Sequence, residues 1–541
     1  MKKFLLIILI PLLNISQNNQ IYIDGTFEDW NNINNYIDSN DNIANGVDFL
    51  NVSITNDSQY LYIKFETSNE IDLSDGMNNI ELMIDTDNDK KTGWQPGFNN
   101  NIGVELGIMF NQRFVWYNVP NPDLQLSFYD IGIYPAPTVT SNTFEIAVDL
   151  EAQYNDTPLF PNSEIKLQLT DWSSLDNIPE NGLEIIYNIN DNFISYSPID
   201  INKESSNLVR LTAYNVLNNG FNNENRLPKL KNIIQALNAD IFAFSECANT
   251  SEETVKNILD EILPIEVSTG WFVVKKENDD LILASQYPII EHWPNEANGI
   301  NAMHPCLIDL PDNLYETDLL VINAHMSCCD NDNNRQNQAD DFVNFILDAK
   351  NQGGEITIDP ETPFILCGDL NLVGFSQQLT TILSGEIIDT DIYGPGGGMN
   401  WSNNDLKDQI CWNTELPLSY TWRDLYPNEE IPGSYPPGRL DFIIFSDDII
   451  TAKKSFSLDT EFMSQGNLNS YDLSYEDSSG SDHLAITTDF EIPLKLSSID
   501  SIRVKKKIIN SFDIIGRDSH QNKLQINMYD NGQIEKKYKI K

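Results

Sequence analysis

The sequence predicts an α/β domain that follows an all-β domain and precedes a small β segment at the C-terminus. Residues from about 208 to 492 alternate apolar, strand-like runs with amphipathic helical patterns. Residues from about 20 to 200 contain short runs rich in β-branched and aromatic side chains, separated by clusters of Asn, Asp, Gly and Pro. Residues from about 495 onward form short strand-like runs with a basic end. We therefore expect three folded parts with different roles.

The composition excludes several classes of protein. The 541 residues include 33 Lys and Arg against 81 Asp and Glu, a net charge of −48, and 40% of them are hydrophobic. The apolar content excludes wholesale disorder, and the charge excludes a basic protein that coats nucleic acid. No apolar run reaches the length of about 18 residues that indicates a transmembrane segment. The acidic charge favours solubility and disfavours anionic substrates at long range, although salt screens this repulsion beyond about 8 Å.

The first residues predict export. A basic start at residues 1–3 is followed by an apolar run from Phe4 to Leu13 and by a polar stretch at residues 14–17. This order is typical of a secretory signal peptide, and we expect residues 1–16 to be removed by cleavage after Ser16. The apolar run is too short to anchor the chain in a bilayer. The predicted location is therefore outside the cell or on a bacterial cell surface.

Export makes disulfide bonds possible for the six cysteines. Cys247 and Cys367 lie inside apolar strand-like runs, which favours buried thiols. The adjacent Cys328 and Cys329 lie in a polar loop and are the better disulfide candidates, but the sequence assigns no pairing. No CxxC pair is present, so the spacing does not indicate a zinc site.

The all-β part, residues 20–200, is predicted to be a β-sandwich. Runs such as Tyr60–Phe65 and Thr143–Val148 have strand composition, and no long helical pattern interrupts them. The polar stretch from Ile201 to Asn207 is a plausible linker to the α/β part, residues 207–493.

Helices and strands alternate in the α/β part. Two sets of apolar residues repeat at helical spacing: Leu227, Leu230, Ile234 and Leu237, then Ala339, Phe342, Ile346 and Ala349. Six strand-like runs accompany them: 208–216, 239–244, 319–324, 363–367, 440–445 and 484–490. Each of these runs brings a polar side chain to one of its ends: Asn215, Glu246, His325, Asp369 with Asn371, Asp441, and Asp482 with His483.

Convergence of these strand ends predicts a catalytic metal site. Three or more carboxylates this close cannot all stay ionised without a cation. Oxygen ligands suit Mg²⁺, Mn²⁺ or Ca²⁺ rather than zinc. A hard metal beside histidine fits metal-assisted hydrolysis of a phosphoester, in which a base activates water.

Spacing separates the roles of neighbouring residues. Asp369 and Asn371 are two residues apart, so in an extended segment both side chains lie on one face. Asp482 and His483 are adjacent and would diverge, which leaves Asp482 available for metal. His483 then needs a different carboxylate to orient its ring, and Asp441 is our candidate.

Taken together, the motifs resemble the endonuclease/exonuclease/phosphatase superfamily. Six pieces match in family order over about 285 residues: Tyr214–Leu217, Phe244–Glu246, Asn323–Met326, Gly368–Asn371, Gly438–Phe442 and Gly480–Leu484. The resemblance implies a four-layer α/β/β/α sandwich with two facing sheets and outer helices. It also implies that Asn215, Glu246 and Asp482 hold a catalytic Mg²⁺ or Mn²⁺.

The remaining roles follow from the same resemblance. His483 is expected to act as general base, oriented by Asp441, and Asp369 and Asn371 to contact the attacking water or the phosphate. His325 matches the branch that contains deoxyribonucleases, sphingomyelinases and sugar-phosphate phosphatases, where this histidine binds the phosphate. The branch of abasic-site endonucleases typically lacks it.

One departure bears on the substrate. Nucleases of the superfamily often carry a Tyr/Arg/Glu cluster between the Glu and His motifs, where this chain reads Gly270–Glu277, and only Lys275 could replace the arginine. Our leading hypothesis is a secreted nuclease that hydrolyses phosphodiester bonds in nucleic acid. The alternative is a phosphomonoesterase or a sphingomyelinase-type phospholipase, and a third hypothesis is a non-catalytic adhesin.

The N-terminal part resembles a family-9-type carbohydrate-binding (DOMON-like) module. The matching pieces are Ile23–Gly25, Trp30, Ile84–Asp89 and Thr92–Trp94. The resemblance makes a glycan a candidate partner, and Trp30, Trp94, Trp116 and Trp172 could stack on sugar rings, although core packing is the simpler interpretation. Asp85, Asp87 and Asp89 could bind calcium or could form a plain acidic turn, and they do not match an EF-hand.

The last part, residues 495–541, resembles a type IX secretion C-terminal sorting domain. The matching pieces are Phe512–Arg517, Met528–Gly532 and Lys536–Lys539. Residues 501–541 contain 10 basic and 4 acidic side chains, a net charge of +6. The resemblance implies export by the secretion machinery of a two-membrane bacterium, with removal of the tail. A basic arm that binds polyanions is the competing interpretation.

Overall fold

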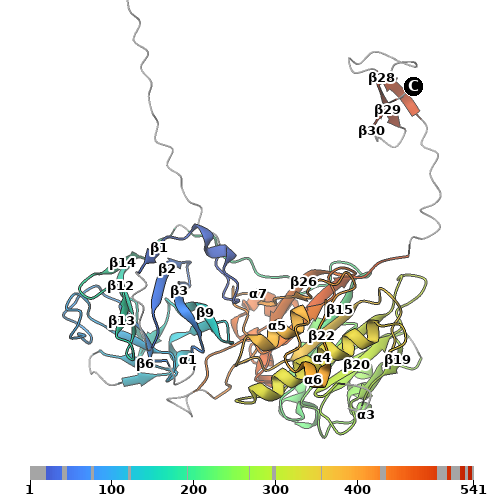
Figure 1. The fold of residues 1–541 in the computed structure, drawn as a ribbon, viewed down its shortest axis with the longest axis horizontal. Coiled ribbons are helices and arrows are strands. Elements are labelled where there is room, and N and C mark those ends of the chain that lie inside the picture. Colours follow the sequence, from blue (N-terminus) through green and yellow to red (C-terminus); the bar gives the residue numbers. More distant parts are fainter. Residues whose placement is uncertain are drawn as a thin grey trace, which may run out of the picture. The chain divides into compact units, whose positions relative to one another are not determined.

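The computed structural model describes residues 20–38, 46–74, 78–119, 124–191, 193–266, 268–294, 300–354, 356–426 and 434–495, together with three later strands. The predicted signal peptide, residues 1–16, lies outside the described residues. The chain forms two compact units (Figure 1). The larger takes in the described residues up to Pro493 except Asp312–Glu316, and the smaller takes in Asp312–Glu316 with the described residues from Leu494.

The first part of the larger unit is built from two antiparallel β-sheets. One has the strand order β1-β2-β3-β9-β8: β1 (Asn35–Ile37), β2 (Phe49–Asn56), β3 (Tyr60–Ile71), β9 (Ser141–Asp149) and β8 (Ile133–Ala136). The other has the order β13-β12-β4-β5-β6-β7: β13 (Asp176–Ile178), β12 (Glu164–Asp171), β4 (Ile80–Asp85), β5 (Leu106–Met109), β6 (Phe114–Tyr117) and β7 (Leu124–Leu126). Strand β14 (Ile185–Asn188) also pairs with β12.

One apolar core joins these two sheets. Phe65 and Phe144 from the first sheet and Leu82 and Ile108 from the second are all buried in it. The short elements between the strands are the hairpin β10 (Gln153–Tyr154) and β11 (Thr157–Pro158), the 3-10 helix η1 (Glu28–Asn32) and helix α1 (Phe128–Ile131). The predicted β-rich N-terminal part is therefore confirmed.

The second part of the larger unit contains two mixed sheets. The first has the order β17-β18-β16-β15-β27-β26-β24: β17 (Phe272–Lys275), β18 (Ile282–Ser285), β16 (Ile241–Ser245), β15 (Val209–Asn215), β27 (Ala485–Glu491), β26 (Thr451–Leu458) and β24 (Trp412–Asn413). The second has the order β19-β20-β21-β22-β25-β23: β19 (Ile289–His292), β20 (Met303–Ile308), β21 (Leu319–His325), β22 (Phe364–Asp369), β25 (Asp441–Phe445) and β23 (Lys407–Asp408). The predicted mixture of strands and helices is confirmed.

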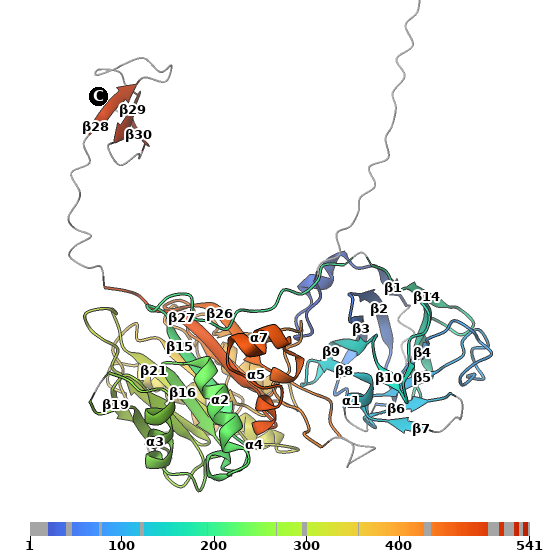
Figure 2. The same ribbon diagram turned by 180° about the vertical axis from the view of Figure 1, so that it is seen from behind.

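Helices cover both sheets (Figure 2). α2 (Leu227–Leu237) and α3 (Glu252–Ile262) pack on the first sheet, and α4 (Asp332–Lys350) and α5 (Gln377–Ser384) pack on the second. The shorter helices are α6 (Thr390–Tyr393), α7 (Gln465–Ser470), η2 (Gly220–Asn222), η4 (Thr460–Phe462) and η5 (Asp477–Gly480). In the described part of the chain, none of the helices combines the length and the apolar character needed to cross a bilayer.

Local chemistry explains where α2 and α3 begin and end. α2 has a proline in its first turn and stops at Asn238, which adopts a left-handed conformation with φ of 45°. α3 starts after Ser251, whose side chain accepts a hydrogen bond from the N–H of Thr254. Leu230, Ile234 and Leu237 are buried, as their spacing predicts.

The two sheets of this part are joined by a buried asparagine. Asn323 on β21 donates its amide Nδ2 to the carbonyl of Phe244 on β16, 2.9 Å away, and to that of Ile282, 3.2 Å away. A buried amide that bridges two sheets favours one relative position of their strands, because any shift would leave it unpaired.

The N-terminal part and the α/β part contact each other directly. Ile23 forms a parallel bridge with Leu418, and its N–H donates to the carbonyl of Pro417 at 2.9 Å. Trp412 donates its Nε1–H to Asp24 at 2.9 Å. The predicted linker begins inside the α/β core, because Ile201 is buried there.

All six cysteines lie in the described part of the chain and are free thiols there. Cys247 and Cys367 are buried, as predicted, while Cys328 and Cys329 are exposed. The two exposed sulfur atoms lie 2.7 Å apart as thiols, and these two disulfide candidates are free in the structure.

The smaller unit contains an antiparallel three-stranded sheet, β28 (Ile508–Phe512), β29 (Leu524–Tyr529) and β30 (Ile534–Tyr538). Within the same unit, Tyr315 forms a bridge with Leu494. The sorting-domain motif residues 513–517 and 530–532 lie outside the described residues.

Candidate active site

The predicted polar residues meet at one edge of the two facing sheets. Three of them end a strand or follow one directly: Asn215 ends β15, Glu246 follows β16, and Asp369 ends β22. His325 ends β21 and pairs in register with Asp369. Asp441 begins β25, which runs antiparallel to β22 and therefore starts at the edge where β22 ends. His483 precedes β27, which runs antiparallel to β15.

Asp369 is the centre of this group. Its Oδ2 accepts a hydrogen bond from Asn215 Nδ2 at 3.0 Å and lies 3.5 Å from His483 Nε2 and 3.6 Å from His325 Nε2. Its Oδ1 accepts the N–H of Asn371 at 3.0 Å. Burial raises the pKa of Asp369, and the charge of His483 opposes the rise, so the pKa is about 6. One carboxylate oxygen thus faces both histidines.

His483 and Asp441 form a buried pair. Nδ1 of His483 lies 2.7 Å from Oδ2 of Asp441. Thr421 Oγ1 accepts the backbone N–H of Asp441 at 2.9 Å, which holds the start of β25 in place. Burial lowers the pKa of His483, but the charges of Asp441 and Asp369 more than offset this and raise it to about 10. The sequence-based pairing of these two residues agrees with this geometry.

His325 has a partner that the sequence did not reveal. Its Nδ1 lies 2.8 Å from Oδ2 of Asp280, a residue just before β18. Burial lowers the pKa of His325, but the hydrogen bond to Asp280 and the charge of Asp369 raise it to about 9. Protonated, His325 presents an Nε2–H donor beside Asp369, where it could bind a phosphoryl oxygen.

Asn215 and Glu246 are neighbours, as the predicted metal set requires. Asn215 Nδ2 donates to Glu246 Oε1 at 3.0 Å, and Asn215 Oδ1 accepts the N–H of Leu217 at 3.0 Å. Glu246 adopts a left-handed backbone conformation with φ of 60°, and its other oxygen accepts the N–H of Asn218 at 2.5 Å. A strained residue at a strand end is typical of functional sites.

Asp482, the third predicted metal ligand, also faces the site. Its Oδ2 accepts the indole N–H of Trp422 at 3.2 Å, a contact that the sequence did not predict. Burial raises the pKa of Asp482, and the negative charge of Glu246 adds to the rise. The two carboxylates therefore repel each other across the site.

These donors fit a hard divalent cation. Glu246 and Asp482 supply carboxylate oxygens, which Mg²⁺ and Mn²⁺ prefer. Asn215 turns its Nδ2 toward Glu246 and Asp369, so it would hold a cation through Oδ1 only with its amide group turned over. The repulsion between Glu246 and Asp482 is the kind that a bound cation relieves. A second arrangement, Asp369, Asp441 and His483, also has ligand atoms within 4.8 Å of one another, and Oδ1 of Asp441 is buried without a hydrogen-bond partner.

Lys275 does not contribute a charge to the site. Its ammonium donates to the carbonyls of Cys247, Ala248 and Thr250, at 2.8, 2.7 and 2.9 Å. It thereby supports the loop that follows Glu246. The superfamily's arginine has no replacement in this side chain.

The structure places two of the three acidic residues named for calcium in one group with a further carboxylate. Asp85 and Asp87 lie together, but their third neighbour is Glu105, and the three carboxylates approach one another within 4.8 Å. Asp89 is not in this group, and its Oδ1 accepts the N–H of Lys91 at 3.1 Å in the turn.

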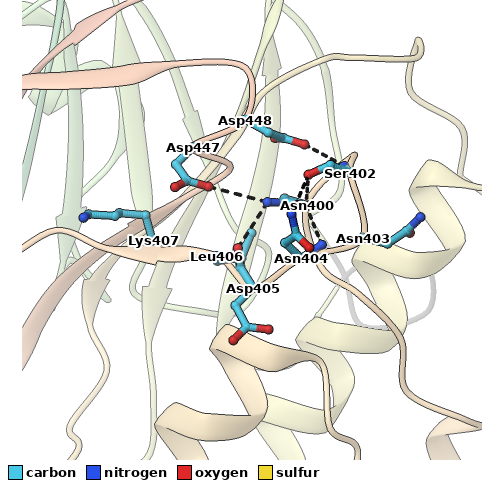
Figure 3. Close-up of a pocket in the computed structure, with 9 residues that line it drawn as sticks. All are labelled: Asn400, Ser402, Asn403, Asn404, Asp405, Leu406, Lys407, Asp447 and Asp448. Carbon is cyan, nitrogen blue, oxygen red and sulfur yellow. Dashed lines mark hydrogen bonds between the residues drawn. The ribbon is translucent and has the colours of Figure 1, made fainter.

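A surface cavity of about 650 Å³ lies away from this chemistry (Figure 3). Asp447 and Asp448, which line it, follow the end of β25, whereas Asp441 begins that strand. Asn400 Nδ2 donates to Asp447 at 3.5 Å, and Asp448 accepts the N–H of Ser402 at 2.7 Å. The polar groups of the cavity mostly satisfy one another.

Comparison with known proteins gives one family. The model of the Endonuclease/Exonuclease/phosphatase family matches residues 212–483, about half of the chain. None of the curated proteins matches.

Solved structures match about half of the chain at low identity. The catalytic domain of human Nocturnin with bound sulfate is 14% identical over 53% of this chain and 95% of its own, with a TM-score of 0.32. Truncated TDP2 from Caenorhabditis elegans is 14% identical over 52% and 97%, with a TM-score of 0.34. A family protein from Leptotrichia buccalis is 16% identical over 52% and 100%, with a TM-score of 0.31. These likenesses do not bear on the substrate.

Proposed function

Because the chain belongs to the endonuclease/exonuclease/phosphatase family and is a hydrolase of phosphoester bonds, we propose that it is a divalent-metal-dependent phosphodiesterase that cleaves nucleic acid. The observation that carries the proposal is the position of Asp369 Oδ2, between His483 Nε2 and His325 Nε2 and bonded to Asn215. The candidate base His483, the candidate cationic donor His325 and the proposed metal ligand Asn215 thereby surround one carboxylate oxygen.

In the proposed mechanism, a water molecule attacks phosphorus, and the bond to the leaving oxygen breaks. The leaving oxygen keeps the bonding electron pair and takes a proton from solvent. His483 takes the proton of that water at Nε2, while Asp441 accepts the hydrogen bond from Nδ1 and fixes the ring. His325, held at Nδ1 by Asp280, donates from Nε2 to a phosphoryl oxygen. The side chain of Asn371 is held in place because its Nδ2 donates a hydrogen bond to the carbonyl of Met326 at 2.9 Å.

A bound divalent cation would supply polarisation of the phosphoryl oxygen and a positive charge that favours the neutral form of His483. Asn215, Glu246 and Asp482 are the residues proposed to hold it, as Mg²⁺ or Mn²⁺. The packing of helices on the outer faces of two facing sheets supports the four-layer α/β/β/α arrangement for this domain.

The test is hydrolysis by the full chain. Plasmid DNA, RNA, sphingomyelin and a generic bis-phosphodiester are incubated with Mg²⁺, Mn²⁺ or Ca²⁺, or with chelator, and the His483→Ala variant is the control. Cleavage of DNA or RNA that is lost with chelator and in the variant supports the proposal. Intact nucleic acid with every metal would contradict it.

A phosphomonoesterase or sphingomyelinase-type phospholipase is the second candidate. Tyr426 and Tyr435, which lie between Trp422 and β25, are exposed to 68% and 51%, and Lys275 is bound to backbone carbonyls. Exposed aromatic side chains favour a lipid surface, and a nucleic-acid groove would call for available cations. Turnover of sphingomyelin without DNA cleavage in the same assay would establish this candidate.

We also propose export, on the strength of the sequence features at the two ends of the chain. Sequencing the N-terminus of the protein from the culture medium tests it, and a start after Ser16 is expected. A glycan partner of the N-terminal part stays a proposal, supported by the 37% exposure of Trp94 beside Trp172, whose ring centroid is 6.1 Å away.

A further inference from the structure

The structure gathers three carboxylates at one end of the second sheet of the N-terminal part. Asp85 is the last residue of β4, Asp87 follows it in the loop, and Glu105 directly precedes β5. β4 and β5 are antiparallel partners with Ile84 opposite Leu106, so the strand pairing itself brings the first and third carboxylates together. One oxygen from each of the three lies within 4.8 Å of the others.

Two oxygens in this group are buried and have no hydrogen-bond partner. Asp85 is 0% exposed and Glu105 is 5% exposed. Asp85 Oδ2 accepts the N–H of Gly103 at 3.1 Å and Glu105 Oε2 accepts the N–H of Thr86 at 2.8 Å, but Asp85 Oδ1 and Glu105 Oε1 are unsatisfied. A buried carboxylate oxygen without a partner lowers the stability of the fold unless a ligand supplies the missing contact.

Hydrogen bonds within the loop fix the side chain of Asp87 beside Asp85 and Glu105. Thr92 Oγ1 lies 3.0 and 2.9 Å from its two oxygens, and the N–H of Asp89 donates to Oδ1 at 2.8 Å. Asn162 Nδ2 donates a hydrogen bond to the backbone carbonyl of Asp87 at 2.6 Å. The loop therefore fixes the third carboxylate.

The backbone passes close to the unsatisfied oxygen of Glu105 at Gly93. Gly93 has φ of 63°, and a Cβ there would come within 2.6 Å of Glu105 Oε1 and 2.5 Å of the carbonyl of Val104. A larger residue at this position would clash with that oxygen, so glycine allows the loop to lie against the carboxylate.

Among the described residues, none of the salt bridges pairs a cation with Asp85, Asp87 or Glu105. Lys166, whose charge acts on Asp85, binds the carbonyl of Asn101 at 2.8 Å and Glu184 at 3.0 Å instead. Burial raises the pKa of Glu105 to about 8, with a further contribution from the charges of Asp87 and Asp85. Three acidic groups this close favour either protonation or a cation.

We propose that Asp85, Asp87 and Glu105 bind a hard divalent cation, Ca²⁺, at a site separate from the catalytic one. Oxygen ligands from carboxylates in an irregular loop suit Ca²⁺, which accepts varied geometry, better than Mg²⁺, which requires a near-ideal octahedron. No histidine or cysteine is in the group, so a softer metal is not favoured. The proposal does not depend on the nature of the enzyme's substrate.

The experiment compares two matched variants of the full chain, Glu105→Gln and Asp89→Asn. Each removes one carboxylate charge at the same end of the sheet, but only Glu105 belongs to the proposed site. Ca²⁺ is removed with chelator and its binding is measured by equilibrium dialysis. We expect Glu105→Gln to bind one Ca²⁺ fewer per chain than wild type, and Asp89→Asn to bind as many as wild type.

A second readout is local to the loop. Lys90 and Lys91 are exposed there, so a lysine-specific protease that needs no Ca²⁺ should cut the chelated protein at these residues. Ca²⁺ at about ten times its dissociation constant should slow this cleavage about 10-fold, because it binds only the ordered loop. The protection should persist in Asp89→Asn and vanish in Glu105→Gln and in Asp85→Asn. Mg²⁺ at the same concentration should protect less.

Three outcomes would overturn the proposal. The first is an unchanged count of bound Ca²⁺ in both Glu105→Gln and Asp85→Asn. The second is equal cleavage at Lys90 and Lys91 with and without Ca²⁺ in the wild-type chain. The third is loss of binding in Asp89→Asn with retention in Glu105→Gln, which would assign the site to a different set of residues.

Discussion

His325 and Asp280 form a hydrogen bond of 2.8 Å between Nδ1 and Oδ2, although 45 residues separate them in the chain. The bond holds the ring of His325 so that its Nε2 lies 3.6 Å from Asp369 Oδ2. It also stabilises the imidazolium, because the neighbouring carboxylate favours the charged form. Asp280 is therefore a positioning residue for His325.

Replacing Asp280 should lower the pKa of His325. The pKa of about 9 depends on Asp280, so Asp280→Asn should reduce it by about one unit or more, toward the ordinary value of 6.5. The positive charge is present below the pKa and is lost above it, so at pH 8 the variant loses charge that wild type keeps. NMR titration of histidine carbons in the chelated protein measures this, with His325→Gln to assign the signal.

The neighbouring substitution Asp279→Asn is the control, because the carboxylate of Asp279 lies 3.6 Å from Lys276 and accepts the N–H of Asp280, and it acts on His325 only through Asp280. Its effect on the pKa of His325 should be smaller than that of Asp280→Asn. An unchanged titration of His325 in Asp280→Asn would contradict the assigned role. With active enzyme, the variant's KM should rise more steeply than that of wild type between pH 6 and 8.

His483 and Asp441 should act as one unit in catalysis. Removal of a general base reduces kcat by about 10²–10⁴-fold, and we expect this for His483→Ala. Asp441→Asn should cost about 10–100-fold, because the ring is retained but is no longer oriented by a carboxylate. In the double variant the two losses should not add, because Asp441 acts through His483. Strictly additive losses of kcat would show that Asp441 has an independent role.

Glu81 should make the N-terminal part less stable as the pH rises. This residue of β4 accepts the indole N–H of Trp172 at 2.7 Å, and burial raises its pKa from 4.5 to about 7. Below pH 4.5 both the folded and the unfolded chain are protonated at this group. Between pH 4.5 and 7 only the unfolded chain ionises, so the free energy of unfolding falls, by about 3 kcal/mol in all.

Glu81→Gln should remove this dependence. Between pH 4 and pH 8, the free energy of unfolding of the variant should rise by about 2–3 kcal/mol relative to that of wild type. Denaturant unfolding followed through tryptophan fluorescence measures this. The exposed Glu151→Gln is the matched control and should follow wild type. Parallel curves for wild type and Glu81→Gln would contradict the prediction.

The buried ion pair of Arg210 with Asp489 should be important for stability. The guanidinium donates to both carboxylate oxygens, at 2.6 and 2.8 Å, and the side chains are 2% and 0% exposed. Asp489→Asn would leave a buried charge without its partner and should destabilise the α/β part by about 3–5 kcal/mol. The exposed pair of Lys453 with Glu491 is the contrast, and Glu491→Gln should cost less than about 1 kcal/mol in the same unfolding experiment.

The sequence could predict the active-site edge because strand ends are local features. Asn215, His325 and Asp369 each stand where an apolar run stops, and parallel pairing of β15 with β16 and of β21 with β22 brings such ends together. The geometry of adjacent side chains in an extended segment indicated only that Asp482 is not the partner of His483, and Asp441 was the candidate that the family resemblance also implied.

Partners that depend on distant pairing could not be predicted in this way. Asp280 follows two polar residues and looks like part of a turn, and only the fold places it beside His325. Glu105 is brought to Asp85 by the pairing of β4 with β5, whereas Asp89, at the expected spacing, is used by its own turn. A regular spacing of acidic residues does not distinguish a ligand from a turn residue.

The bond between Trp412 and Asp24 joins residues 388 positions apart, and this has a consequence for biosynthesis. At roughly 5–20 residues per second, a ribosome needs about 20–80 s to reach Trp412 after it has made Asp24. During that time Ile23, Tyr60 and Tyr62, which are buried together with Leu418 and Leu484 in the finished fold, lack those partners. The nascent N-terminal part thus presents an apolar surface to the cell until the end of translation, and a holdase chaperone that binds such surfaces would protect it.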